Sequence, residues 1–275
     1  LPQIVVSTGA KQCLANVAAV MLNAGDEVLL PCPYWVSYSD IVKLNDGVPV
    51  EVKTSIDTDF KMTAAQLEAA ITPKTKMIWF SSPCNPSGSI YSEAELRALA
   101  DVLVRHPNIY VVSDEIYEHI NFTDAHFSIG RCPEVKDRAI TVNGFSKGFA
   151  MTGWRIGYIG ANETIAKACT KLQGQFTSGA NTIAQMATIE ALAHPAEKVS
   201  ELKVVFQRRR DLIVTELSKI KSLRVNKPVG AFYVFPDVSA FYGRSFEGQK
   251  IESSNDLCMF LLEYAKVATT PGEAF

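Results

Sequence analysis

The chain has 275 residues, of which 47% are hydrophobic and 20% charged. This balance is typical of a globular protein with a large buried core, and the length predicts one large domain, or one and a part of a second. The formal net charge of -2, with no basic run longer than Arg208 to Arg210, argues against nucleic acid as a partner.

The six cysteines form neither a CxxC pair nor a cluster with histidines. This spacing indicates no metal site and no disulfide framework, and it favours a reducing, cytoplasmic location. Neither a targeting segment nor a membrane-spanning apolar run is visible. The sequence opens without Met on a strand-like segment and stops at Phe275, just after a turn-like Pro271-Gly272. We therefore expect both ends to be truncated.

Short apolar runs rich in Val, Ile and Tyr alternate with helical patterns along the first half of the chain. This alternation predicts an α/β fold with a mostly parallel sheet flanked by helices. The strands are expected at residues 27–30, 49–53, 76–80, 109–112, 139–142 and 156–159. Thr63 with Gln66, and Ser92 with Glu95, have the spacing of capping boxes at two helix starts.

From about Asn162 the pattern changes to long helices, expected over 163–193 and 197–221 with a break at His194-Pro195. A strand at 231–238, a helix at 256–266 and a strand at 267–270 are expected to follow. We predict a large cofactor-binding domain over 1–196. Residues 197–275 are predicted to form a connecting helix and an incomplete smaller α+β domain.

Three of the predicted strands lead into loops rich in polar side chains. After KMIWF comes SSPCNPSG, after IYVV comes SDEIYEH, and after AITV comes NGFSKGFAMTGWRIG. Ligands bind beyond the carboxyl ends of strands in an open α/β sheet, which places Asn85, Asp114 with Tyr117, and Lys147 with Arg155 at a candidate site. Each residue alone has an ordinary explanation as a surface charge, a turn residue or a helix cap. Their joint occurrence carries the prediction.

The segment GFSKGFAMTGWRIG resembles the pyridoxal 5'-phosphate (PLP) attachment motif of class I aminotransferases, with every fixed position occupied. SSPCNPSG, SDEIY and PCPYWVSY resemble the other signatures of that family, in the right order. The resemblance covers essentially the whole chain and is nearest to prokaryotic aspartate aminotransferases. It implies a fold type I PLP-dependent transferase that moves an amino group between aspartate, or a similar amino acid, and 2-oxoglutarate by a ping-pong mechanism. It also implies a homodimer with its sites near the subunit interface.

The same resemblance implies a role for each residue around the cofactor ring. Lys147 would attach PLP as a Schiff base and then act as the general base. Asp114 would keep the pyridine nitrogen protonated, while Tyr117 and Asn85 would hydrogen-bond the ring's 3-oxygen. Trp35 would stack on the ring, and Trp35 and Asn85 would also contact the substrate.

The phosphate requires backbone donors and a cation. The segment STGAKQ leads into a helical pattern, so Gly9 permits close approach, and the amides of Ala10 and Lys11 form an anion-binding helix N-terminus. Arg155 adds a planar cation suited to phosphate oxygens, and Ser146 is a further candidate. The segment lacks GxxxxGK[ST], so it is not a nucleotide P-loop.

The chain departs from the family pattern in two places. Gly144 stands where the family often has a phosphate-binding serine, and we expect Ser146 or Asn143 to compensate in part. The family's arginine for the substrate α-carboxylate lies beyond a PGEAF-like segment, but the sequence stops at Phe275. We therefore expect weak or no activity from the chain as it stands.

Three other functions are compatible with parts of the sequence. GFSKG also matches the G-x-S-x-G nucleophile elbow of α/β-hydrolases, with Ser146 as nucleophile. In that family the serine is followed along the chain by an acid and then by a histidine. After Ser146 the only histidine is His194, and the only acids between them are Glu163 and Glu190. All three lie in one helical pattern, which argues against a hydrolase. A non-catalytic PLP-binding regulator and an aromatic or alanine aminotransferase on the same scaffold remain as alternatives.

Overall fold

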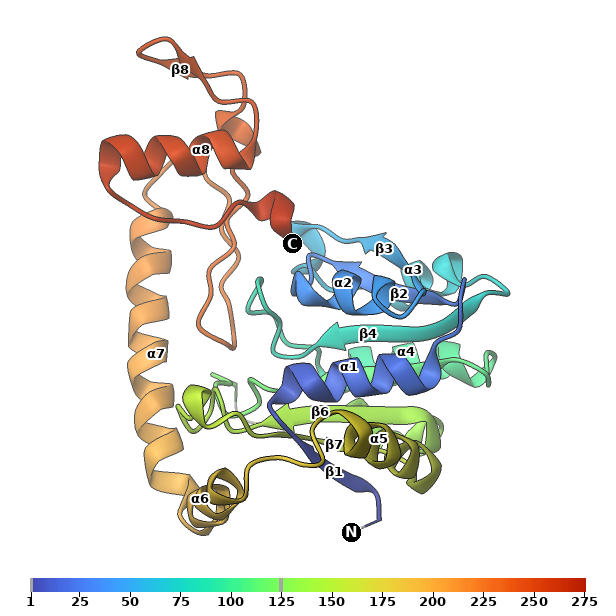
Figure 1. Ribbon diagram of the computed structural model, residues 1–275. Coiled ribbons are helices and arrows are strands. Elements are labelled where there is room, and N and C mark those ends of the chain that lie inside the picture. Colours follow the sequence, from blue (N-terminus) through green and yellow to red (C-terminus); the bar gives the residue numbers. More distant parts are fainter. Residues whose placement is uncertain (1, 124–125) are drawn as a thin grey trace.

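The computed structural model describes residues 2–123 and 126–275. In these ranges a seven-stranded sheet forms the centre of the molecule (Figure 1), in the order β1-β7-β6-β5-β4-β2-β3. Its strands are β1 (Ile4–Ser7), β2 (Glu27–Cys32), β3 (Val48–Lys53), β4 (Thr75–Ser81), β5 (Tyr110–Asp114), β6 (Ala139–Gly144) and β7 (Gly157–Gly160). Strands β3, β2, β4, β5 and β6 pair in parallel, whereas β7 is antiparallel to both β6 and β1. The predicted mostly parallel α/β sheet is confirmed.

Helices cover both faces of this sheet. They are α1 (Ala10–Met21), α2 (Ser37–Lys43), α3 (Ala64–Ala70), α4 (Glu93–Val104) and α5 (Glu163–Phe176). One buried cluster joins α1, α2 and α5 to the side chains of Val28 and Leu30, while a second joins α3 and α4 to Leu29. Successive residues of β2 thus point to opposite faces, and both faces are buried, which explains why the strand reads as a continuous apolar run.

Both predicted capping boxes are present. The Thr63 hydroxyl accepts from the Gln66 amide at 3.2 Å, and the Gln66 side chain accepts from the Thr63 amide at 2.9 Å. Ser92 and Glu95 form the same reciprocal pair at the start of α4. These bonds satisfy backbone donors that a helix start otherwise leaves free.

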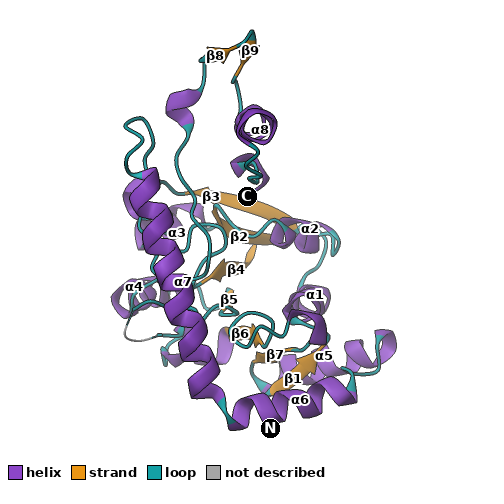
Figure 2. Cartoon of the chain, turned by 90° about the vertical axis from the view of Figure 1, so that its left-hand side faces the viewer, coloured by secondary structure: helices purple, strands orange, loops and turns teal. Residues whose placement is uncertain are grey.

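The single helix expected over 163–193 is wrong. The chain leaves the helix after Phe176, Ser178 adopts a positive φ of 60°, and the Asn181 side chain caps a new helix, α6 (Thr182–Ala193). The following helix, α7 (Pro195–Leu217), runs along one side of the molecule from α6 to the C-terminal unit (Figures 1 and 2).

The strands expected at 231–238 and 267–270 are also wrong. The first segment makes one isolated bridge, from Asp237 to Arg224, while Gly230, just before it, bridges Asn121. Pro236 has no amide hydrogen for a ladder. The helix expected at 256–266 is present as α8 (Ser254–Phe260) continued by a π-helical turn (Leu261–Ala265). The strands β8 (Ser245–Phe246) and β9 (Gln249–Lys250) form a small hairpin.

Short 3-10 helices lie in the connections, at Ile56–Thr58, Ile129–Arg131, Lys136–Arg138, Thr152–Trp154, Ser239–Phe241 and Gly272–Ala274. Among the helices of residues 2–123 and 126–275, none combines the length and the apolar character needed to cross a membrane.

Candidate active site

A pocket with a cavity volume of about 230 Å³ lies at the carboxyl ends of β4, β5 and β6, where an open α/β sheet binds ligands. It is lined by Ala10, Lys11, Trp35, Tyr38, Ser81, Asn85, Asp114, Ile116, Tyr117, Ser146, Lys147, Thr152, Arg155 and Tyr233. The fold therefore brings together every residue predicted for the site except Gly9, which lies directly behind the Arg155 guanidinium.

Lys147 lies in the turn that follows β6, with its side chain half-buried. Its ammonium nitrogen Nζ is 5.4 Å from the centroid of the Phe232 ring and 5.7 Å from that of the Tyr117 ring. Burial, and then repulsion from Arg155, lower the pKa of Lys147, while Asp114 opposes the shift. A lowered pKa increases the share of the neutral amine, which is the form that acts as nucleophile or base.

Asp114 ends β5 and is almost fully buried. Tyr38 Oη donates to its Oδ2 at 2.8 Å, and the Ile116 amide donates to its Oδ1 at 3.1 Å. Burial raises the pKa of Asp114 to about 6, although these two hydrogen bonds act in the opposite direction. A buried carboxylate facing a pocket is suited to a cationic nitrogen, because an opposite charge restores what desolvation takes away.

Tyr38 was not among the residues predicted for the site. Its ring packs edge-on against Trp35 at 5.7 Å and against Trp79 at 5.9 Å, which fixes its hydroxyl on Asp114. The only sequence signal was its place three residues after Trp35 in PCPYWVSY, where a helical turn brings the two rings to one side. Tyr233 was also missed, since its segment was expected to be a strand.

Asn85 and Tyr117 occupy the wall between β4 and β5. The Asn85 amide donates to Ser81 Oγ at 3.3 Å, whereas its side-chain Oδ1 is buried without a hydrogen-bond partner among the residues described. The Tyr117 hydroxyl lies 2.5 Å from that of Tyr233. A buried polar atom without a partner is costly, so Asn85 Oδ1 indicates a place for a ligand donor.

The end of the pocket formed by Arg155 and the start of α1 is suited to an anion. Gly9 has a φ of 82°, and a Cβ there would overlap the Arg155 guanidinium. A Cβ on Gly157 would overlap the backbone of Ala10, so β7 lies tightly against the start of α1. The first amides of a helix have no acceptor within the helix, and Ala10 and Lys11, at the start of α1, line the pocket together with Arg155. Lys11 Nζ lies 4.8 Å from the centroid of the Trp35 ring.

The close pairing of two strands explains why position 144 is a glycine. A Cβ at this position would lie 2.8 Å from the Ile156 carbonyl oxygen, because β6 and β7 pair closely there. Of the two residues expected to compensate, Ser146 lines the pocket, but Asn143 is buried and its Oδ1 accepts from the Gly144 amide at 2.7 Å. The expectation for Asn143 is therefore wrong.

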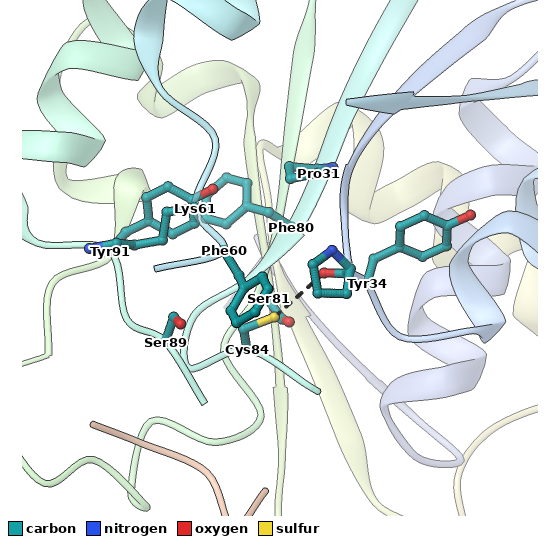
Figure 3. Close-up of a pocket in the computed structure, with 10 residues that line it drawn as sticks. Pro31, Tyr34, Phe60, Lys61, Phe80, Ser81, Cys84, Ser89 and Tyr91 are labelled. Carbon is teal, nitrogen blue, oxygen red and sulfur yellow. Dashed lines mark hydrogen bonds between the residues drawn. The ribbon is translucent and has the colours of Figure 1, made fainter. Parts of the chain in front are cut away.

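A second cavity lies beside the first and shares Ser81 with it (Figure 3). Its volume is about 10 Å³, which is enough for one water molecule at most. Cys84, drawn at its centre, donates weakly to the Pro33 carbonyl oxygen at 3.9 Å. The larger pocket is therefore the candidate site for a ligand.

Glu115, Glu118 and His126 also gather close together, within 4.8 Å. Glu115 is buried and its oxygens are already occupied: Oε1 accepts from the hydroxyls of Ser113 and Ser128, and Oε2 pairs with His126 at 2.8 Å. Both Glu115 oxygens therefore already have partners within this ion-pair network, although His126 Nδ1 is buried without one among the residues described.

The described residues do not assemble a hydrolase triad. Ser146 lines the pocket, but His194 lies on the surface at the end of α6, paired with Glu190 at 3.4 Å. Glu163 pairs instead with Lys167, one turn along α5. The turn after Ser146 continues into a short 3-10 helix and β7, and an elbow requires an α-helix there.

Comparison with known proteins identifies the family. The family model for aminotransferase class I and II matches residues 2–275. The chain is 47% identical to an aspartate/prephenate aminotransferase of Cereibacter sphaeroides, covering 99% of this chain and 69% of the relative. It is 45% identical to a bifunctional aspartate aminotransferase and glutamate/aspartate-prephenate aminotransferase of Petunia hybrida, and spans 58% of that longer protein.

Solved structures agree. The aspartate aminotransferase of Rhizobium meliloti superimposes with a TM-score of 0.96 at 44% identity, covering 99% of this chain and 69% of that one. The aspartate aminotransferase of Thermus thermophilus, solved with maleate, has a TM-score of 0.91 at 39% identity, with the same coverage. The fold, the order of the motifs and these matches place the chain in the class I and II aminotransferases, a PLP-dependent family.

Proposed function

We propose that this protein is an aminotransferase that moves the amino group between aspartate, or a similar amino acid, and 2-oxoglutarate by a ping-pong mechanism. The observation that carries the proposal is the convergence of Lys147, Asp114, Asn85 and Arg155 on one pocket from loops far apart in the sequence. Aspartate is favoured because relatives bear its name, and one was solved with maleate, a dicarboxylate with the same number of carbons.

The residues present fit PLP. The Arg155 guanidinium, which packs against Gly9, and the start of α1 suit a phosphate, and the buried Asp114 suits a protonated pyridine nitrogen. Asn85 lines the same pocket, and its side-chain NH2 would donate to the ring's 3-oxygen. When bound, PLP supplies the electron sink that stabilises a carbanion at the substrate Cα.

Each residue then has one task. Lys147 Nζ would attach the cofactor and, once displaced by the substrate amine, would take and return the Cα proton. Asp114 would hold the pyridine proton, while Tyr117 and Asn85 would hydrogen-bond the 3-oxygen. The packing of Tyr38 against Trp35 would keep the Asp114 carboxylate aimed at the ring.

The test is spectroscopic. PLP is added to the wild-type protein, to Lys147→Ala and to Lys167→Ala, a control on the exposed face of α5. We expect a bound-cofactor absorbance in the wild type and in Lys167→Ala that changes when aspartate is added, and none in Lys147→Ala. In the full-length protein, an absorbance that no amino acid changes would favour the non-catalytic regulator. A larger response to alanine or an aromatic amino acid would replace aspartate as the substrate, and 2-oxoglutarate and prephenate would be compared as acceptors.

The proposal includes a homodimer, for which α6 provides support. This helix is apolar on most sides, yet only Ala184 and Thr188 are buried. Its exposed apolar side chains are Ile183 (75% exposed), Met186 (61%), Ile189 (60%) and Leu192 (56%). A helix that is hydrophobic all round is normally buried, so we propose that a second copy of the chain covers α6.

The proposal also keeps the predicted division into domains. Residues 1–196 would be the large cofactor-binding domain, and residues 197–275 would comprise the connecting helix and part of a smaller domain. Most of α7 and the C-terminal unit lie outside the two helix layers of the sheet, which supports this division (Figure 1).

A further inference from the structure

Tyr233 reaches the cofactor pocket from the C-terminal side of α7. Its hydroxyl oxygen lies 2.5 Å from that of Tyr117, with ring centroids 5.7 Å apart and the rings near-perpendicular. Its neighbour Phe232 also meets Tyr117 edge-on, at 5.4 Å. The Tyr117 side chain is thus held from one side by two residues more than a hundred positions further along the chain.

The backbone that carries Tyr233 is tied to the large domain at two points. The Ala231 amide donates to the Ile120 carbonyl at 2.7 Å, and the Gly230 amide donates to the Gly88 carbonyl at 2.9 Å. Ile120 follows Tyr117 in the loop after β5, and Gly88 belongs to the loop after β4 that carries Asn85. The Tyr233 hydroxyl is therefore positioned relative to both walls of the pocket.

A third contact comes from α7. The Arg210 side chain is 7% exposed, its guanidinium donates to the Pro228 carbonyl oxygen, and it lies 4.8 Å from the centroid of the Phe122 ring. A buried cation is retained where it is paired and hydrogen-bonded, and here it fixes the start of the segment 228–233. A residue whose hydroxyl must point in one direction needs a backbone that is held in place, and these contacts hold it.

Each tyrosine has one hydroxyl hydrogen to donate. If Tyr117 donated to Tyr233, it would have no hydrogen for a ligand in the pocket that it lines. If Tyr233 donates to Tyr117, the hydrogen of Tyr117 is free to point into the pocket. Hydrogen bonds in such a chain strengthen one another.

We propose that Tyr233 is a positioning residue, which donates its phenolic hydrogen to Tyr117 Oη and so directs the hydrogen of Tyr117 to the 3-oxygen of PLP. The inference rests on the proposed function and deepens it. Four titratable groups surround Tyr117: Asp114, Cys84, Lys147 and Tyr233 itself. Replacing Tyr233 with Phe leaves the other three in place.

The experiment is a pH titration of the bound-cofactor absorbance in the wild type, Tyr233→Phe, Tyr117→Phe and the double variant. Loss of the Tyr233 donor weakens the stabilisation of negative charge on the 3-oxygen, so we expect the apparent pKa of the absorbance change to rise by about 0.5 to 1 unit. In the Tyr117→Phe background, Tyr233→Phe should cause no further rise. Tyr242→Phe, an exposed position, serves as the control.

An unchanged pKa in Tyr233→Phe would overturn the inference, and so would a rise that persists in the Tyr117→Phe background. If Tyr233→Phe does not fold, 3-fluorotyrosine at position 233 provides the second test. Its more acidic phenol is a stronger donor and should lower the apparent pKa, whereas a purely structural role predicts no change. A wild-type chain without any Lys147-dependent absorbance would instead remove the proposed function, and the inference with it.

Discussion

At Asp114, burial raises the pKa of the carboxyl group, whereas the hydrogen bonds from Tyr38 and Ile116 lower it. Its folded-state pKa of about 6 lies above the usual 3.8, so the folded chain favours the protonated carboxyl. Its contribution to stability is therefore fully present below about pH 4 and is lost as the pH rises through 6. A shift of this size corresponds to about 3 kcal/mol.

In the cofactor-free protein, Asp114→Asn should abolish the loss of folding stability that Asp114 causes as the pH rises through 6. We expect its free energy of unfolding to fall less than that of the wild type between about pH 4 and pH 7.5. Denaturant unfolding at several pH values measures the difference, with Asp101→Asn on the exposed face of α4 as the control. The same variant should bind PLP at least about tenfold more weakly, because the charge that faces the pyridine nitrogen is gone. Identical pH dependence in the variant and the wild type would contradict the assignment.

Gly9 is required by both its backbone and its neighbour. Its φ of 82° is strained for other residues, and a Cβ would overlap the Arg155 guanidinium. We expect Gly9→Ala to cost about 1 to 3 kcal/mol of stability and to weaken PLP binding sharply. Gly25→Ala separates the two effects, since Gly25 has a φ of 85° with no atom near the added Cβ. Equal PLP affinity in the two variants would show that Gly9 does not shape the phosphate end.

At the scale of elements, a buried polar network holds α1 in place. Gln173 of α5 accepts from Ser7 Oγ at 2.5 Å and from Asn16 at 3.0 Å, and it donates to the Val6 carbonyl at 2.8 Å. One side chain thus joins β1, α1 and α5 directly behind the predicted phosphate site.

Gln173→Leu should leave these buried partners unsatisfied. We expect a loss of about 2 to 4 kcal/mol in the free energy of unfolding and weaker PLP binding, because the start of α1 would shift. The comparison is Gln175→Leu on the exposed side of the same helix, which should change neither quantity. Chemical denaturation and cofactor titration provide the two measurements. A stable Gln173→Leu protein with wild-type affinity would show that α1 is held by apolar packing alone.

The sequence predicted elements well where a local signal was sufficient. Strands buried on both faces, such as β4, read as apolar runs, and the capping boxes at Thr63 and Ser92 marked helix starts. It failed at 231–238, because β-propensity describes residues that suit a sheet and does not supply a partner strand. It also missed the break at Ser178, since the apolar character of α6 continues the helical pattern.

At the scale of the molecule, α6 leads to a prediction about assembly. Met186→Glu places a charge in the proposed contact and should weaken self-association at least about 100-fold. Sedimentation measures this change, and Leu44→Glu, an exposed apolar position at the end of α2, should leave self-association unchanged. A wild-type monomer at high concentration would contradict the dimer.

By itself, the sequence determined the family, the cofactor and the order of strands and loops that bear the site residues, because these depend on motifs and periodicities within short segments. Only the tertiary structure decided which side chains support that site. Tyr38 reaches Asp114 across 76 positions and Tyr233 reaches Tyr117 across 116. Contacts between segments so far apart are set by packing of the whole fold, and no local pattern of residues encodes them.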